Sequence, residues 1–185
     1  MRLLIYLLSC LYFFLPAYVC NMTPPLSKKA GILRSLAKPI DSGKTIRGKP
    51  ILGSHKTWRG ALLGIFIGML MACLQFYLYH FPFFKKLSLI NYQTINILVF
   101  GFLICFGAVL GDLSFAFIKR RLGLKPGEVF LPFDQTNYVI GAFILSQPFL
   151  KLPLLIWITI FVSTFFLHII VNRLGYHLGL HKAKW

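Results

Sequence analysis

Long apolar windows dominate this sequence, at about residues 2 to 22, 60 to 80, 93 to 114, 135 to 150 and 153 to 172. A helix that crosses a lipid bilayer needs roughly 18 to 20 mainly apolar residues, and several of these windows meet that length. Hydrophobic residues make up 57% of the 185 positions, more than one soluble core would bury. The connecting loops are too short to form a separate globular unit. The sequence therefore predicts an all-α integral membrane protein with a single membrane domain, residues 1 to 185.

The windows predict about five transmembrane helices, with four as the alternative. The last two windows are nearly fused, and the segment "SQPFLKLP" between them carries Pro148 and Pro153, which break a helix, with Lys151 able to reach an interface. We therefore expect a tight hairpin there. A cleaved secretory signal is the alternative for the first window. Since "AYVCNM" lacks a small-x-small cleavage pattern, we expect a retained first span.

Lysine and arginine are distributed unevenly between the two sides of this topology. The loop at about 23 to 59 holds nine of them, the loop at about 115 to 134 holds four, and the tail 173 to 185 holds three. The four on the other side are Arg2, Lys85, Lys86 and Lys151. Positive charge accumulates on the cytoplasmic side of membrane proteins. We therefore expect a multi-pass protein of the cell (inner) membrane, with both basic loops and the tail in the cytoplasm.

Small residues recur at four-residue steps in two of the predicted spans. Gly60, Gly64, Gly68 and Ala72 lie on one face of the second, and Gly107 and Gly111 share a face of the third. Such faces let two membrane helices approach closely. We interpret them as packing surfaces, and we interpret the four cysteines, which all fall in apolar windows without paired spacing, as packing residues too.

The chain has only four acidic residues, and all lie in or beside the two basic loops: Asp41, Asp112, Glu128 and Asp134. Asp112 is predicted at the membrane edge of the third span, seven residues before Lys119. A carboxylate at that depth is costly unless it pairs with a cation or binds a metal. Asp112 is therefore the strongest candidate functional residue.

Asp134 lies in "LPFDQTNYVIGA", where the chain re-enters the membrane. Two aspartates at facing helix ends, with lysines and arginines between them, are suited to hold Mg²⁺ on a polyphosphate. The glycines at 43, 48 and 53 would let backbone amides approach phosphate oxygens. No Walker A pattern occurs. These residues predict a phosphate-rich ligand at the cytoplasmic face, and the alternative is a basic loop that contacts anionic lipid.

Four blocks in order carry a family resemblance: "KPIDSGKTIRGKPILGSHKTWRG", "GDLSFAFIKRRLGLKPG", "LPFDQTNYVIGA" and "NRLGYHLGLHKAKW". They resemble the CDP-archaeol synthase family of small five-span membrane cytidylyltransferases, and the middle two also look like the signature of CDP-diacylglycerol synthases. The resemblance implies that CTP and an anionic membrane phospholipid acid, of archaetidic or phosphatidic type, give a CDP-lipid and pyrophosphate with Mg²⁺. The implied partners are CTP, the lipid acceptor and the bilayer, with no nucleic acid.

The resemblance also assigns roles to residues. Asp112 and Asp134 match the family's metal-binding carboxylates, and Asn137 stands where a second acid is usual. The expected catalytic cations are Lys56, Arg59, Lys119 and Arg120. The expected substrate-binding residues are Asp41, Gly43, Arg47, Gly53, Thr57, Gly60, Lys125 and Gln135.

Two departures from the family pattern keep an alternative open. Ala116 replaces a usual serine, and Asn137 offers a metal only a neutral carbonyl oxygen. A catalytically silent relative that binds anionic lipid or nucleotide is therefore the second hypothesis. A small transporter or structural membrane protein is the third, although the chain lacks the internal repetition and mid-membrane charges expected of a transporter.

Overall fold

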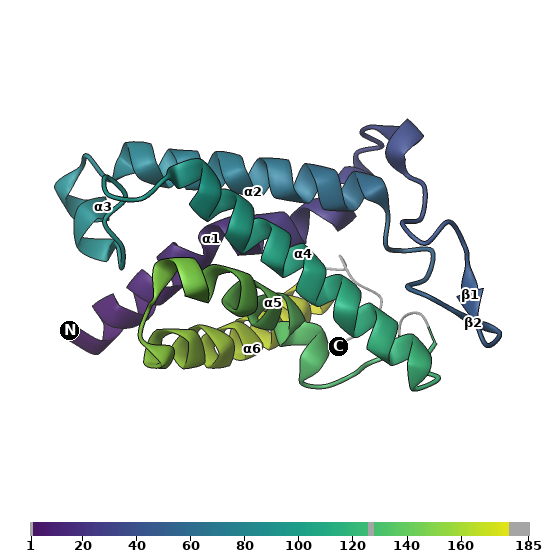
Figure 1. Ribbon diagram of the computed structural model, residues 1–185. Coiled ribbons are helices and arrows are strands. Elements are labelled where there is room, and N and C mark those ends of the chain that lie inside the picture. The colour runs from purple at the N-terminus through teal and green to yellow at the C-terminus, as the bar shows by residue number, and fades with distance from the viewer. Residues whose placement is uncertain (1, 126–127, 178–185) are drawn as a thin grey trace.

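The computed structural model describes residues 2–125 and 128–177, and within them the chain forms a helical bundle with a small hairpin at one end (Figure 1). The elements in order are α1 (Arg2–Lys29), the 3₁₀ turn η1 (Arg34–Leu36), β1 (Thr45–Ile46), β2 (Lys49–Pro50), α2 (Trp58–Leu78), α3 (Pro82–Leu87), α4 (Ile97–Arg121), α5 (Phe133–Leu150) and α6 (Leu154–His177).

Each predicted apolar window corresponds to one long helix, so the prediction of an all-α membrane protein is confirmed. Among the described residues, four helices are long and apolar enough to cross a membrane: α1, α2, α4 and α6. Helix α5 has 18 residues, and its first residue, Phe133, is followed by the polar run Asp134–Asn137, which lowers its apolar content. The count of five spans is therefore approximate, because α5 does not meet the criterion that the other four meet.

The structure moves several predicted boundaries. Helix α1 continues to Lys29 instead of ending near residue 22, and α4 continues to Arg121 instead of ending near 114. Basic side chains are favourable in the last turn of a helix, where they interact with the exposed carbonyl groups. Gly123, with φ of 84°, then lets the chain turn away. Lys119 and Arg120 therefore lie on a helix and not in the predicted loop.

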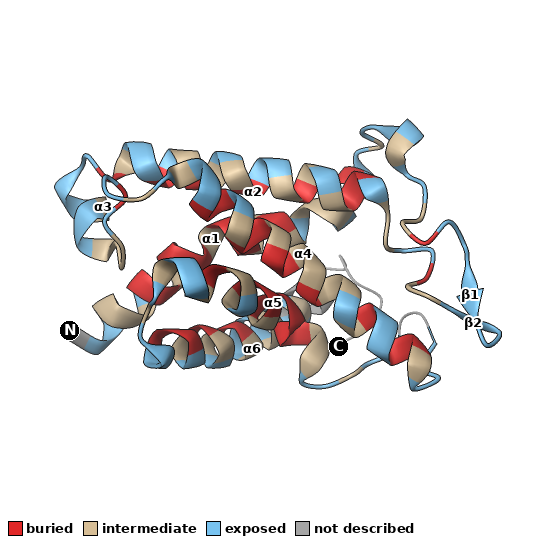
Figure 2. Cartoon of the chain, viewed as in Figure 1, coloured by how far each residue is buried: buried red, intermediate tan, exposed pale blue. Residues whose placement is uncertain are grey.

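The core is built on close helix contacts at small residues. On α2, a Cβ atom at Gly64 would lie 2.8 Å from the Cys20 carbonyl oxygen of α1, and one at Gly68 would lie 2.7 Å from the Pro16 carbonyl oxygen. On α4, Gly107 and Gly111 pack in the same way against Gly141 of α5. The predicted small-residue faces are confirmed. Buried residues follow these inner faces, while much of α2 is exposed on its outer side (Figure 2).

Helix α1 is part of this core. Cys10, Phe13, Phe14, Ala17 and Cys20 are all buried. The Cys20 thiol donates to the Cys105 carbonyl oxygen at 3.7 Å and the Cys105 thiol donates to the Pro16 carbonyl oxygen at 3.6 Å. These cysteines pack α1 against α4, as expected from their apolar surroundings.

The charged segments gather at one end of the bundle. Figure 1 shows the hairpin, the C-terminal end of α4 and the start of α5 at that end, with α3 at the opposite end. Helix α3 carries Lys85 and Lys86. The predicted separation of the basic loops from these two lysines is therefore present in the fold. Lys182 and Lys184 of the tail lie outside the described residues.

The contact between α4 and α5 yields a stability prediction. Gly107→Ala would place a Cβ atom 2.7 Å from the Gly141 carbonyl oxygen, and the α5 backbone cannot move aside cheaply. Gly101→Ala is the matched control in the same helix, because its Cβ atom would lie 3.0 Å from the Ala72 methyl group. Both changes gain about 1 kcal/mol of helix propensity. We expect Gly107→Ala to be less stable than the control by about 1–3 kcal/mol, measured as thermal unfolding in detergent. Equal unfolding midpoints would contradict this packing role.

Candidate functional site

A polar pocket of about 130 Å³ lies at the charged end of the bundle. Three separate segments of the chain line it. The first loop contributes Leu52, Gly53, His55 and Lys56, helix α4 contributes Asp112, Ala116, Lys119 and Arg120, and the start of α5 contributes Asp134 and Asn137.

The spacing on α4 explains why its four side chains share one wall. Residues 112, 116, 119 and 120 are separated by the three- and four-residue steps that return to the same helix face. Asp112 and Lys119 are two turns apart along this stripe. The seven-residue spacing in the sequence therefore places a carboxylate and a cation in the same pocket.

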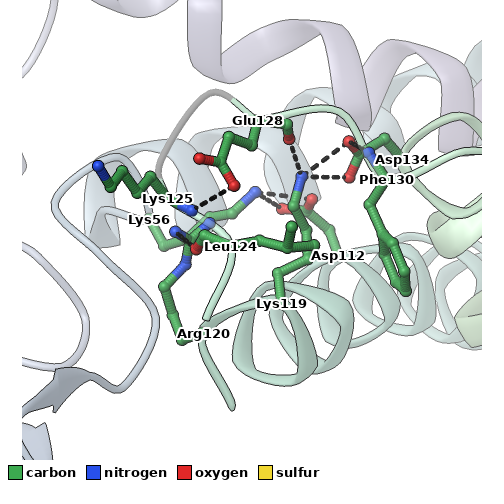
Figure 3. A network of polar contacts seen from close by, with 9 residues as sticks. All are labelled: Lys56, Asp112, Lys119, Arg120, Leu124, Lys125, Glu128, Phe130 and Asp134. Atoms are coloured by element: carbon green, nitrogen blue, oxygen red, sulfur yellow. Dashed lines mark hydrogen bonds and ion pairs between the residues drawn. The ribbon is translucent and has the colours of Figure 1, made fainter. Parts of the chain in front are cut away.

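Two lysine–aspartate pairs dominate the electrostatics of the pocket (Figure 3). The Lys56 ammonium group lies 2.7 Å from both carboxylate oxygens of Asp112. The Lys119 ammonium group lies 2.7 Å from both carboxylate oxygens of Asp134. All four side chains are partly shielded from solvent, Lys119 most of all with 10% of its side chain exposed. Because partial burial makes an unpaired charge costly, each pair neutralises a carboxylate that would otherwise be unfavourable there.

Lys119 also organises the chain between α4 and α5. Its ammonium group donates to the Glu128 carbonyl oxygen at 2.7 Å, and the Phe130 amide donates to Asp134 at 2.8 Å. The neighbouring Arg120 is buried and donates to the Leu124 carbonyl oxygen. These contacts bring the first turn of α5 against the end of α4 and keep both aspartates at one pocket.

Asp41 orders the first loop. Its carboxylate accepts hydrogen bonds from the amides of Gly43 at 3.0 Å, Leu52 at 2.8 Å and Gly53 at 3.0 Å. Burial raises the pKa of the Asp41 carboxyl, but the amides of Gly53, Leu52 and Gly43 together outweigh burial and hold that pKa below its ordinary value of 3.8. A lowered pKa means that the ionised group stabilises the loop above pH 3.8, and this contribution is lost as the pH falls through the lowered value.

The hairpin in this loop turns at Arg47 and Gly48. Thr45 pairs with Pro50 and Ile46 with Lys49, so the turn has two residues. Both have positive φ, 52° and 74°, as a type I′ turn requires. Gly48 adopts this conformation without steric cost, and Arg47 is left exposed at the hairpin tip.

Arg121 fixes the hairpin to the end of α4. Its guanidinium group donates to the carbonyl oxygens of Ile46 at 2.7 Å, Lys49 at 3.1 Å and Pro50. In return, the Lys49 ammonium group donates to the Arg121 carbonyl oxygen at 3.3 Å. The contact holds the first loop over α4, on the side where Gly53 and Lys56 enter the polar pocket.

Several predicted site residues line the pocket and several do not. Those brought together are Lys56, Lys119, Arg120, Gly53, Asp112, Asp134 and Asn137. Arg59, predicted beside Lys56, is buried and donates to the Ile32 carbonyl oxygen at 3.2 Å, outside the pocket. Arg59 lies in the first turn of α2, whereas Lys56 precedes the N-cap, so the two side chains leave the chain in different directions.

The remaining predicted substrate-binding residues have local structural contacts. Thr57 caps α2 by accepting the Gly60 amide at 3.2 Å, and Gly60 packs against Pro24. Gly43 donates to Asp41, the Lys125 amide donates to the Glu128 carboxylate at 2.9 Å, and Gln135 is buried. These residues do not line the polar pocket, and their predicted contacts with substrate stay predictions.

Sequence reasoning missed His55, Leu52 and Arg121. His55 precedes Lys56 and lines the pocket while remaining exposed. Its place next to a predicted catalytic lysine was the available signal. Arg121 follows Lys119 and Arg120 in the same basic run, and nothing local distinguishes a residue that lines a pocket from one that binds a hairpin.

The pocket contains oxygen donors suited to a hard divalent cation. The carboxylates of Asp112 and Asp134 and the amide of Asn137 line it together, and Mg²⁺ prefers such ligands. Among the described residues, no group of three or more His, Cys, Asp and Glu side chains forms a ready-made cage. Mg²⁺ commonly binds through one or two carboxylates plus phosphate oxygens and water, so the donor set fits an ion that arrives with a phosphate ligand.

Comparisons with known proteins agree with the resemblance found in the sequence. The family model described as CarS-like, CDP-archaeol synthase, matches residues 1–185. The CDP-archaeol synthase of Thermofilum pendens is 36% identical over 173 residues, which cover 92% of this chain and 78% of the relative. The CDP-archaeol synthase of Pyrococcus furiosus is 34% identical over 180 residues, which cover 97% of this chain and 98% of the relative.

A solved structure has the same fold. It is described as an intramembrane enzyme for archaeal membrane lipids biosynthesis, and it matches with a TM-score of 0.69 and 24% identity over 88% of this chain and 91% of that one. The helix arrangement is therefore one that a known membrane enzyme also adopts.

The Arg121 contact predicts a local effect of substitution. Arg121→Ala removes the donor to three hairpin carbonyl oxygens. Since hydrogen bonds from a charged group contribute roughly 1.5–3 kcal/mol each, we expect amide hydrogen exchange in residues 41–53 to accelerate at least about tenfold. Lys125→Ala, which removes a nearby exposed charge, should leave this exchange unchanged. Unchanged exchange in Arg121→Ala would show that the hairpin is held by other contacts.

Proposed function

The chain belongs to the CDP-archaeol synthase family, and from that premise we propose that it transfers a cytidylyl group from CTP to a membrane lipid phosphate at the polar pocket. The products are a CDP-lipid and pyrophosphate. The observation that carries this assignment to the pocket is the convergence of Lys56, Lys119 and Arg120 with two carboxylates at the end of the bundle where the charged loops meet.

The reaction is a substitution at the α-phosphorus of CTP. An oxygen of the lipid phosphate forms the new bond to that phosphorus, and the bond from the α-phosphorus to the bridging oxygen breaks, so pyrophosphate leaves with that oxygen. Both reactants are anions, and the main demands are therefore alignment and neutralisation of charge. The acceptor stays in the bilayer, which explains why such an enzyme is a membrane protein.

The cations of the pocket meet these demands. Lys56, Lys119 and Arg120 contribute three positive charges against the two negative charges of Asp112 and Asp134. A polyphosphate that enters would interact with ammonium and guanidinium donors held at the ends of structured segments, and preorganised donors stabilise developing charge more than mobile ones do. Lys56 and Lys119 would then exchange part of their contact with the aspartates for contact with phosphate oxygens.

The residues that would hold Mg²⁺ are Asp112 and Asp134, with Asn137 as a neutral ligand. The ion would supply positive charge to the phosphate oxygens of CTP. Asn137 keeps an oxygen donor where the family usually has an acid. We therefore infer a site for one ion held by two carboxylates, which carries less negative charge than a site with three carboxylates.

The bias of Lys and Arg supports a cytoplasmic location for the pocket. The described residues of the two basic loops lie at the pocket end of the bundle, and the lysines of α3 lie at the other end (Figure 1). CTP is a soluble cytoplasmic nucleotide, so the same orientation gives it direct access. We propose that the protein resides in the cell membrane with the polar pocket facing the cytoplasm.

The function is tested with purified protein, CTP carrying label in the α-phosphate, and a panel of ether- and ester-linked lipid phosphates. We expect label to enter the organic phase only when protein, a lipid phosphate and Mg²⁺ are all present. CTP labelled at the γ-phosphate should instead release its label as pyrophosphate. Absence of organic-phase label with every acceptor would refute the proposed transfer.

The aspartates give the first mutational prediction. Asp112→Asn and Asp134→Asn keep the side-chain size but remove a charge that pairs with a lysine and that the proposed Mg²⁺ would use. We expect each change to lower the transfer rate at least about 100-fold and to raise the Mg²⁺ concentration needed for half-maximal rate. Glu128→Gln is the matched control, because Glu128 is exposed and lies outside the pocket. If either variant keeps wild-type turnover at limiting Mg²⁺, that aspartate is not a ligand.

The lysines give the second mutational prediction. Lys56→Met removes a cation from the pocket, whereas Lys85→Met removes one from α3 at the opposite end of the molecule. We expect the first to cost on the order of 3 kcal/mol in kcat/KM and the second to have little effect. A basic surface that only attracts anionic lipid would instead give about 1 kcal/mol per lysine, erased by salt. Similar, salt-sensitive losses in both variants would therefore contradict the role of Lys56.

A further inference from the structure

A second cavity adjoins the polar pocket and has a different lining. It measures about 70 Å³ and lies between α1, α2 and α4 under the first loop. Its walls include Pro24 of α1, Ala61 of α2 and Ala108, Val109 and Leu113 of α4. We call it the apolar pocket.

The two pockets meet at one boundary. Within the described part of the chain, His55, Lys56 and Asp112 are the residues that line both. The polar groups of the Lys56–Asp112 pair therefore stand at one end of the apolar pocket and at the edge of the polar one. A molecule with an apolar body and an anionic group would find partners for both parts across this boundary.

The apolar pocket lies between two candidate membrane spans, next to the charged end of the bundle. Ala61 is in the first turn of α2, Val109 is at the midpoint of α4, and Leu113 lies about one turn further along α4. Both helices are candidate membrane spans. The outer face of α2 beside the pocket is apolar and exposed at Leu62, which is 48% accessible. The apolar pocket thus joins apolar segments of two candidate spans to the charged Lys56–Asp112 pair, which is the arrangement that a lipid phosphate with its chains in a bilayer requires.

The size of the apolar pocket limits what it holds. Sites that enclose a whole drug-sized ligand measure roughly 300–1,000 Å³, well above 70 Å³. Two long lipid chains cannot fit. The pocket suits only the glycerol backbone of a lipid, between the phosphate and the start of the chains, while the chains remain in the bilayer.

We propose that the apolar pocket binds the glycerol backbone of the acceptor lipid phosphate, and that the phosphate of this lipid contacts Lys56 at the shared boundary. The polar pocket then holds the phosphates of CTP. This inference rests on the proposed transfer. It follows from the requirement that the attacking oxygen and the α-phosphorus come within about 3–3.5 Å, because substrates in the two pockets can approach each other only at the boundary.

Photolabelling tests the site directly on the unmodified protein. The probe is a dialkyl glycerol phosphate with a diazirine on the first carbon of one chain, and adducts are located by mass spectrometry. We expect adducts on residues 20–24, 61 and 108–113 that decrease when unlabelled lipid phosphate is added. Adducts confined to outward positions such as Phe66, Leu70 and Val162, as in lipid that merely surrounds the protein, would overturn the proposal.

Two filling variants with matched controls test it kinetically. Val109→Phe and Ala61→Phe narrow the apolar pocket. Val99→Phe on α4 and Leu62→Phe on α2 add bulk at exposed positions outside it. We expect each filling variant to raise the acceptor KM at least about tenfold, with the CTP dissociation constant, measured by calorimetry, within about twofold of wild type and of the controls. CTP binding also verifies that each variant is folded.

The outcomes separate this inference from the proposed function. If the wild-type protein forms no CDP-lipid but the probe labels the apolar pocket, the transfer is refuted and the lipid site stands. If transfer occurs but the filling variants leave the acceptor KM unchanged, or weaken CTP binding to the same degree, the lipid site is refuted and the transfer stands.

Discussion

Neutralisation of two partly buried carboxylates at the charged end of the bundle is the interaction on which the rest of the site depends. Asp112 and Asp134 are partly buried and would be costly there without partners, and each is paired with a lysine from a different segment. Lys56 ties the first loop to α4, and Lys119 ties α4 to α5. The two ion pairs therefore do more than balance charge, because they set which three segments meet at the pocket.

These pairs are possible only because the helices that carry them approach closely. Gly107 and Gly111 of α4 lie against Gly141 of α5, where a Cβ atom on any of them would overlap backbone. In a bilayer, such close packing takes the place of the hydrophobic driving force that acts in water. The first loop is ordered separately, by the three amides on Asp41 and by the contact of Arg121 with the hairpin. Rigid helix packing and an ordered loop together hold Lys56 near Asp112.

Local patterns in the sequence predicted the helices, the small-residue faces and the α4 wall of the site, because hydropathy, glycine spacing and the helical repeat act over a few residues. They did not predict the pairing of Lys56 with Asp112, which are 56 positions apart. They also did not predict that Lys56 lines the polar pocket while Arg59, three positions later, lies outside it. That difference depends on where α2 begins and on which side of it the chain packs. The ends of α1 and α4 were also missed, because hydropathy falls at Lys and Arg while the helix itself continues.

The charge inventory of the chain explains why this end of the bundle is suited to anionic substrates. Twenty Lys and Arg face only four Asp and Glu. Asp41 is occupied by backbone amides, Asp112 and Asp134 by lysines, and Glu128 by the Lys125 amide. The protein therefore cannot balance its own positive charge at this end. Anionic headgroups, CTP and the lipid phosphate can supply the missing charge, and each is stabilised by the same excess. An excess of one charge destabilises a folded protein through self-repulsion, and an enzyme whose substrates are all anions at a membrane surface offsets that cost by using the excess to bind them.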